Sequence, residues 1–319
     1  MAYKVRYMWH PTHLVSDLEA CSKFFREVFN VTSVPVEANL PPREECPTYP
    51  RDYSILTMIR EVMFDCIDPL KYVVEGRQTF ESVDAPGHGH LSGFGLAVDG
   101  ADELYKACVA NGIRSTDQAN RLGSPNRPPV TGFKPATLFF TLPETTGLRY
   151  QIYARAATGP PHPRVDPEWT LPPVSADDPL SLEFCSHHTI LSSNPAKALN
   201  FLVGILHGRV IHQGCNELLE TDSTYIALGD GVYEVAVPTR AGSFAARDLR
   251  FNAPFAFDTY HALTWKVADL SKVRRHLEAK NIPLLMQDEH TLVTDPKHTI
   301  GVPWGFTDRK VPGDLRLSP

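Results

Sequence analysis

The sequence predicts an α+β protein in which two similar domains follow one another along the chain. The main observation is a phrase, His10-Pro-Thr-His-Leu-Val-Ser-Asp17, that precedes an amphipathic helix and returns as His187-His188-Thr-Ile-Leu-Ser-Ser-Asn194. In both copies seven residues separate the histidine from Asp or Asn (10 to 17 and 187 to 194), and fourteen separate it from the first Phe of the helix. With 319 residues the chain is long enough to form two domains.

A constant spacing between matching positions also indicates a duplication. Three pairs of positions are each 169 residues apart, namely Asp65 and Glu234, Val98 and Val267, and Ile113 and Ile282. His10 and His187 are 177 apart, and the longer proline-rich loop of the first half accounts for this difference. A fixed period of this kind predicts four modules in two domains.

Each module is expected to contain a strand, a helix and further strands. Asp17 stands at the N-cap position of the first helix, and Gly112 follows the end of the second. The predicted helices are 17–29, 101–111, 195–206 and 270–280. The predicted strands are 4–10, 53–58, 61–67, 72–75, 93–98, 136–141, 148–154, 184–191, 225–228, 232–237, 261–267 and 291–294, with two more near Val210 and Leu284.

A proline-rich stretch without periodicity, 158–180, is predicted to link the domains. The domains are then 1–157, with modules 4–76 and 90–155, and 181–310, with modules 183–240 and 256–308. Residues 311–319 form a tail.

Composition and charge exclude several classes of function. The net charge is −6 and no basic run occurs, which argues against nucleic acid and membrane surfaces as partners. The N-terminus lacks the apolar segment of a signal peptide, and the six cysteines are scattered without a CxxC pair. We therefore expect a cytoplasmic protein with reduced thiols that acts on a small-molecule substrate, and a homo-oligomer is compatible with the sequence.

Several phrases together resemble the vicinal oxygen chelate superfamily, which includes glyoxalase I, methylmalonyl-CoA epimerase, extradiol ring-cleaving dioxygenases and antibiotic-sequestering proteins. The phrases are His10-x4-Val15-x-Asp17-Leu18 with Phe24-Phe25, Val98-Asp99, Val267-x-Asp269-Leu270, Phe64-Asp65-x3-Pro69, Asp295-Pro296 and Gly147-x3-Gln151-x-Tyr153. The resemblance implies four βαβββ modules that form two cup-shaped domains of curved mixed sheets, with the helices outside. Four modules in about 300 residues is the layout of extradiol dioxygenases and of some fused glyoxalases. Pairing of modules across the linker also occurs in the family.

The resemblance further implies a divalent metal held by residues of the first and last strands of each module. In the second domain it implies a metal set of His187 (His188 if the register slips by one residue), Glu234 and His261. Strict strand register would instead place Ala262 at the ligand position of the fourth module, one residue from His261, and the last strand of that module lacks a Glu.

The first domain offers a second candidate set, His10, Asp65 and Gln151. Gly93 occupies the fourth ligand position there, and His90 lies nearby. We favour the second domain, because its carboxylate, Glu234, stands in the expected alternating strand and the His187-His188 doublet tolerates an error in register. Glu234 is also a charge within an apolar run and needs a partner if it is buried.

These expectations lead to three hypotheses about function. The first is a mononuclear metal enzyme, dioxygenase-like with Fe(II) as the first guess and Zn, Mn, Ni or Co as alternatives, acting on an aromatic or vicinally oxygenated molecule. His188 or His212 would act as the base, and four aromatic residues would line the substrate pocket: Tyr260, Trp265, Trp304 and Phe306. The second hypothesis is an isomerase, epimerase or lyase of the same fold, with or without metal. The third is a metal-free protein that binds or sequesters a small molecule.

Overall fold

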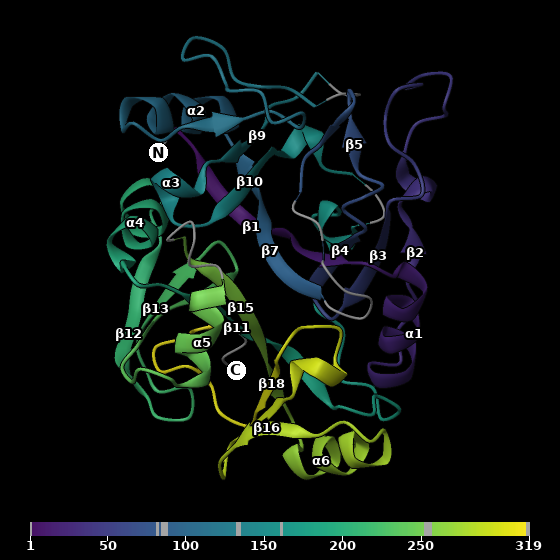
Figure 1. Cartoon of the computed structure of the whole chain (residues 1–319), viewed down its shortest axis with the longest axis vertical. Helices are drawn as coiled ribbons and strands as arrows, with labels where there is room; N and C mark the ends of the chain where they lie inside the picture. The colour runs from purple at the N-terminus through teal and green to yellow at the C-terminus, as the bar shows by residue number, and fades with distance from the viewer. Residues whose placement is uncertain are drawn as a thin grey trace. The chain divides into compact units, whose positions relative to one another are not determined.

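The computed structural model describes residues 2–80, 83, 89–131, 135–159, 162–251 and 257–316, and the side chains of residues 250 and 251 are not considered. Contacts divide the chain into two units (Figure 1). Unit one comprises Met1–Thr145 with Arg149–Pro172, and unit two comprises Thr146–Leu148 with Pro173–Pro319. Parts of three predicted segments lie outside the described residues. They are residues 160 and 161 of the linker, residue 256 at the start of the fourth module, and residues 317–319 at the end of the tail.

Unit one contains a mixed sheet with the strand order β2-β3-β4-β1-β7-β10-β9-β8. The strands are β1 (Lys4–Val15), β2 (Val34–Pro35), β3 (Ser54–Ile59), β4 (Val62–Ile67), β7 (Gly89–Asp99), β8 (Ser115–Thr116), β9 (Leu138–Thr141) and β10 (Arg149–Ala154). A separate hairpin consists of β5 (Val73–Val74) and β6 (Arg77–Gln78). At the centre β1 runs antiparallel to β7, while β4 is parallel to β1 and β10 is parallel to β7.

Unit two repeats this arrangement with the order β12-β13-β14-β11-β15-β18-β17-β16. The strands are β11 (Leu182–Leu191), β12 (Arg209–Asn216), β13 (Thr221–Leu228), β14 (Gly231–Pro238), β15 (Thr259–Val267), β16 (Leu284–Gln287), β17 (Thr291–Thr294) and β18 (Trp304–Thr307). The first strands of consecutive modules pair, β1 with β7 and β11 with β15, so each sheet unites neighbouring modules rather than modules from opposite sides of the linker. The identical order of the two sheets confirms the predicted α+β fold and its duplication.

The four predicted helices are present, each beginning within one residue of the predicted start. They are α1 (Leu18–Val28), α2 (Ala101–Ala110), α3 (Pro143–Thr146), α4 (Pro195–Leu199) continued by a π-helical turn (Asn200–Ile205), α5 (Phe244–Phe251) and α6 (Leu270–Ala279), with 3₁₀ turns at Val36–Asn39, Arg155–Ala157, Pro163–Val165 and Pro296–His298. The Asp17 carboxylate accepts hydrogen bonds from the amides of Glu19 (3.0 Å) and Ala20 (2.9 Å), which confirms it as the N-cap of α1. The sequence did not predict α3 or α5.

Side-chain alternation gives each sheet one face towards helices and one face towards a cup. In unit two α4 contacts β14, and α6 contacts β17 and β18. Four aromatic side chains fall on this helix-covered face and are 0–2% exposed: Tyr260, Trp265, Trp304 and Phe306. Thr264 and Gly305, which alternate with them, line a cavity on the other face. The structure therefore corrects the prediction that these aromatic residues line a substrate pocket, and they belong to the core.

Among the helices of the described ranges, none is long and apolar enough to cross a membrane.

His162, from the predicted linker, is buried against β1 of unit one. Its ring stacks on Trp9, with centroids 4.6 Å apart, and lies 5.6 Å from the ring of Tyr7. Burial, together with the positive charges of Arg164 and His10, lowers the pKa of His162 from 6.5 to about 3. The imidazole is therefore neutral in the folded chain at neutral and mildly acidic pH.

We expect the free energy of unfolding to fall as the pH drops below 6.5, because His162 then gains a proton only in the unfolded chain. One such histidine contributes about 1.4 kcal/mol per pH unit. His162→Phe should reduce the pH slope by about this amount, as measured by urea unfolding at several pH values. The matched control is His298→Gln, at an exposed position, which should keep the wild-type slope. An unchanged slope in His162→Phe would contradict the assignment.

Candidate active site

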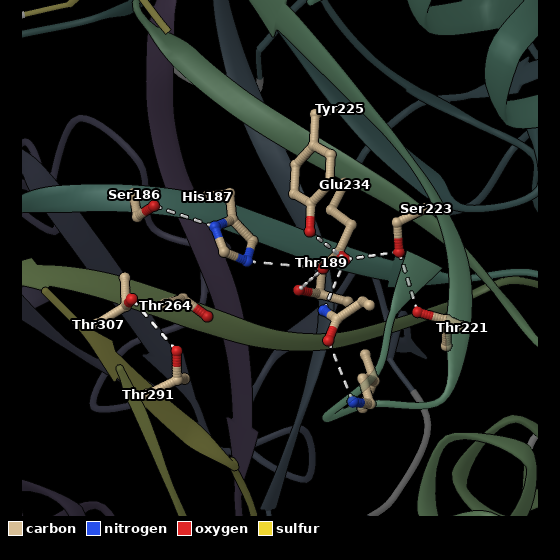
Figure 2. A network of polar contacts seen from close by, with 12 residues as sticks. Ser186, His187, Thr189, Thr221, Ser223, Tyr225, Glu234, Thr264, Thr291 and Thr307 are labelled. Carbon is tan, nitrogen blue, oxygen red and sulfur yellow. Dashed lines mark hydrogen bonds and ion pairs between the residues drawn. The ribbon is translucent and has the colours of Figure 1, made fainter. Parts of the chain in front are cut away.

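A cavity of about 320 Å³ lies on the cup face of the unit two sheet. Strands β11, β13, β14, β15, β17 and β18 all contribute side chains to it, and hydroxyl groups form much of its wall. The hydroxyl-bearing residues that line it are Ser186, Thr189, Tyr225, Thr264, Thr291 and Thr307 (Figure 2). Since alternating residues of each strand point into the cavity, its polar character comes from one face of the sheet.

An imidazole and a carboxylate meet in this cavity. His187 from β11 places Nε2 3.6 Å from Oε2 of Glu234, which comes from the neighbouring parallel strand β14 (Figure 2). Glu234 is completely buried, whereas the His187 side chain keeps 12% of its surface exposed. These two residues are the part of the predicted metal set that the structure brings together.

Four donors surround the Glu234 carboxylate. Oε2 accepts a hydrogen bond from Thr189 (2.6 Å), and Oε1 accepts from Asn216 (3.1 Å), Ser223 (2.7 Å) and Tyr225 (2.8 Å). Burial acts to raise the pKa of Glu234, but the attraction to the protonated form of His187 and the hydrogen bonds from the hydroxyl donors outweigh it and lower the pKa below its ordinary value. When His187 is neutral, the hydrogen bonds remain and stabilise the carboxylate. Glu234 is therefore a buried carboxylate that stays ionised.

Sequence reasoning missed these donors, although two of them were within its reach. Thr189 lies two residues after His187 and so shares its face of β11. Tyr225 pairs with Glu234 across the tight β13–β14 hairpin, whose turn at Gly229-Asp230 fixes the register.

His187 is held in place by its own neighbours. Its Nδ1 lies 3.1 Å from the Ser186 hydroxyl, and the edge of its ring meets Tyr225, with centroids 5.4 Å apart. Burial lowers the pKa of His187, and the negative charge of Glu234 opposes this only in part. A neutral imidazole thus stands beside an ionised carboxylate.

In the opposite half of the cup, a threonine and a glycine stand where His187 and Glu234 stand in the first half. Thr264 of β15 lies directly across from His187 in the antiparallel register, and Gly305 of β18 is the partner of Thr264. A Cβ atom at Gly305 would lie 2.5 Å from Thr264 Oγ1, so this position has no room for a larger side chain. The hydroxyls of Thr291 and Thr307 bond to each other at 3.2 Å.

His261 does not join His187 and Glu234. It is the extra residue of a bulge in β15, where Thr189 pairs with Ala262 and the next residue of β11 pairs with Tyr260. Its Nδ1 lies 2.6 Å from Asp248 Oδ2 of α5, the helix that the sequence did not predict. His261 borders the cavity, but the ligand atoms of the three predicted metal residues do not all come within 4.8 Å of one another.

The two predicted bases fall on opposite faces. His188 lies on the helix-covered face, with Nδ1 2.7 Å from the Tyr260 hydroxyl and its ring stacked on Tyr233. It does not line the cavity, because it is adjacent to His187 in the strand and points the other way. His212 of β12 does line the cavity, with its ring 5.8 Å from that of Tyr225.

The second predicted metal set lies in unit one and consists of His10, Asp65 and Gln151. Hydrogen bonds through Thr12 and Tyr153 connect Gln151 with His10. Gln151 donates to the Thr12 hydroxyl at 2.8 Å and accepts from the Tyr153 hydroxyl at 3.0 Å, and Tyr153 also lies 3.3 Å from His10 Nε2. Gly95, rather than Gly93, is the residue paired with His10. Aromatic and aliphatic residues pack farther along the same face: Leu14, Val36, Tyr53, Ile67, Tyr72 and Phe80.

Asp65 occupies the position in unit one that Glu234 occupies in unit two. Its carboxylate accepts a hydrogen bond from Ser54 alone among the described side chains. Burial raises the pKa of Asp65, and neither His10 nor Ser54 compensates. The two cups therefore hold their carboxyl groups in different ways, and only unit two has the donors that keep its carboxylate ionised.

The unit two residues fit a divalent metal only in part. The 3.6 Å separation between His187 and Glu234 suits two ligands of one ion at about 2.0–2.2 Å each, and both groups have the deprotonated form that a metal needs. Catalytic zinc and non-haem iron sites, however, use three protein ligands, and Thr264 and Gly305 supply none of the usual kind. The described residues thus do not complete such a site.

Comparison with solved structures identifies the fold. The Mn(II)-bound glyoxalase from Novosphingobium aromaticivorans is 12% identical in sequence and aligns over 98% of this chain and 86% of its own, with a TM-score of 0.59. BphC, a halotolerant catechol dioxygenase, is 10% identical over 99% of this chain and 91% of its own, with a TM-score of 0.53. No protein-family model and no curated protein sequence matches the chain. The chain has the fold of vicinal oxygen chelate proteins, which confirms the resemblance at the level of the fold.

We expect Glu234→Gln to lower the pKa of His187 further, because the carboxylate charge is the main influence that raises it. NMR titration of the imidazole resonances, with His187 assigned by its loss in His187→Gln, would measure the change. Asp65→Asn is the matched control, since it should lower the pKa of His10 and leave that of His187 unchanged. An unchanged His187 pKa in Glu234→Gln would show that the two groups do not interact.

Proposed function

We propose that the chain is an enzyme that moves a proton on a small, oxygen-bearing organic molecule bound in the unit two cavity. The reaction would be an isomerisation, an epimerisation or a lyase step. The observation that carries this proposal is the neutral His187 beside the ionised, fully buried Glu234.

In the proposed mechanism His187 accepts the proton. Because burial keeps its imidazole neutral, it is available as a base at neutral pH. Once protonated, it becomes a cation 3.6 Å from the Glu234 carboxylate, whose charge stabilises it. The donors around Glu234 hold the carboxylate in place, so that little reorganisation is needed when the proton moves.

Thr264 is suited to bind an oxygen atom of the substrate. Its side chain lines the cavity across from His187, and its hydroxyl has no hydrogen-bond partner among the described residues (Figure 2). In this position it would donate to an oxygen that gains negative charge as the neighbouring carbon loses its proton.

The size and charge of the cavity indicate the class of substrate. A volume of about 320 Å³ lies at the lower end of the range for small-molecule sites. Its wall carries the carboxylates of Glu217, Glu234 and Asp288 as well as the basic side chains of Arg309 and Lys310, so both signs of charge are present. The hydroxyl-lined wall suits a small molecule with carbonyl or hydroxyl oxygens, such as an oxo or hydroxy acid whose carboxylate pairs with one of the two cations.

A divalent-metal form of the same centre is the second candidate. The spacing and protonation states of His187 and Glu234 favour it, and the glyoxalase of similar fold is Mn(II)-bound. Bound at this pair, an ion would act as a Lewis acid towards a substrate oxygen. We assign no step to a metal, because the described part of the chain places no third ligand beside this pair, and the same shortage makes an Fe(II)-dependent ring cleavage the weaker hypothesis.

To test the proposed proton transfer, a panel of small oxo and hydroxy acids is incubated with the protein in D₂O. NMR then measures the rate at which deuterium replaces hydrogen in each compound. His187→Gln and Glu234→Gln should each slow the exchange by about 10²–10⁴-fold, the usual contribution of a positioned base. His10→Gln and Asp65→Asn make the corresponding changes in unit one and should leave the rate within about a factor of two of wild type.

Elemental analysis of the same samples separates the two candidates. One metal ion per chain, lost in both unit two variants together with activity, would favour the metal-dependent form. Activity that survives both substitutions would exclude this centre. Tight binding of a panel compound without exchange would instead favour a binding protein.

A further inference from the structure

A second group of potential ligands lies in unit one, on the face of the sheet away from the cup. Among the described residues, one set of three or more His, Cys, Asp or Glu side chains has ligand atoms that all lie within 4.8 Å of one another: His13, Cys21 and Cys66. This set is separate from the residues of both cups.

Three elements of the fold bring these side chains together. His13 of β1 and Cys66 of β4 are partners in the parallel register and share one face of the sheet, with Nδ1 and Sγ 3.9 Å apart. Cys21 comes from the first turns of α1, which packs on this face and is fixed at its start by the Asp17 cap. The separation of 3.9 Å is close to the roughly 3.5–4 Å expected between two ligands of a tetrahedral zinc ion.

The position of the group resembles that of a structural metal site rather than a reactive one. All three residues are completely buried. Substrate in a cup could not reach them, since His13 alternates with Thr12 and Leu14 and points to the opposite face. An ion here would join α1 to the two strands beneath it.

The chemistry of the group favours a thiophilic cation. Two of the three ligand atoms are the sulfurs of Cys21 and Cys66, and the third is a ring nitrogen of His13. Two thiolates and a neutral imidazole would carry a total charge of −2, which neutralises Zn²⁺. The buried site would then have no net charge, whereas a monovalent ion such as Cu⁺ would leave it negative.

From this juxtaposition we propose that His13, Cys21 and Cys66 form a zinc-binding site in the core of unit one. Cys₂His is a known ligand set for Zn²⁺, with a small exogenous ligand in the fourth position. The proposal is independent of the proposed function, because the ligands differ and the site serves to hold α1 on the sheet.

Cobalt substitution provides a test that distinguishes this site from the cup. The full-length chain is purified with its thiols reduced, stripped of metal by a chelator and titrated with Co²⁺. Thiolate ligands give a sulfur-to-cobalt charge-transfer band in the near ultraviolet, which ions at His187 and Glu234 cannot produce. We expect a band that saturates at one Co²⁺ per chain and disappears when Zn²⁺ is added.

Variants assign the band to individual cysteines. Cys21→Ser and Cys66→Ser should each abolish it. Cys108→Ser, which removes another buried thiol from α2 of the same unit, should retain it. A band that persists in both ligand variants would place the metal elsewhere and overturn the proposal, and so would the absence of any band in the wild-type chain.

A measurement on the wild-type chain covers the case in which the serine variants do not fold. Zn²⁺ should slow the alkylation of Cys21 and Cys66 by at least tenfold, as mapped by mass spectrometry, and should leave the rate at Cys108 unchanged. Equal rates at Cys21 and Cys66 with and without Zn²⁺ would overturn the proposal.

Discussion

Antiparallel pairing between the first strands of two modules determines the rest of each unit. Once β11 lies beside β15, alternation sends His187 and Thr264 into the cup, and His188 and Trp265 towards the helices. The parallel strand β14 then brings Glu234 next to Thr189. A shift of one residue in the pairing of β14 with β11 would turn Glu234 to the other face and place its carboxylate in the apolar core. The polar cup and the aromatic core are thus two results of one register.

The buried charge of Glu234 sets a second requirement. An ionised carboxylate without partners would cost several kcal/mol in the interior, and here hydroxyl and amide donors from three strands compensate for this cost. These donors could not be inferred from their residue types, because Ser and Thr are common in strands. They become recognisable only through register, as the pairing of Tyr225 with Glu234 shows.

The elements that follow from local rules were predicted from the sequence, and the resemblance correctly placed His187 near Glu234, but features that depend on irregular pairing were not predicted. The Asp17 cap and the 169-residue repeat required only spacing, and both agree with the structure. The position of His261 depends on a bulge, and its partner Asp248 lies on a helix with little sequence signal, so neither could be placed in advance. The aromatic residues of unit two were assigned to the wrong face because a strand pattern does not say which face is the interior.

The duplicated positions of Asp65 and Glu234 show how two copies of one fold can differ in chemistry. Both carboxyl groups stand beside a histidine of the first strand, yet their pKa values shift in opposite directions. Burial acts on both in the same sense, so the difference comes from the number of donors, which is one hydroxyl at Asp65 and four groups at Glu234. Unit one forms the same sheet without a comparable set of donors. The fold therefore does not require the ionised carboxylate that these donors stabilise in unit two. The ionised carboxylate of unit two is therefore better explained by the function of the cup than by the stability of the sheet.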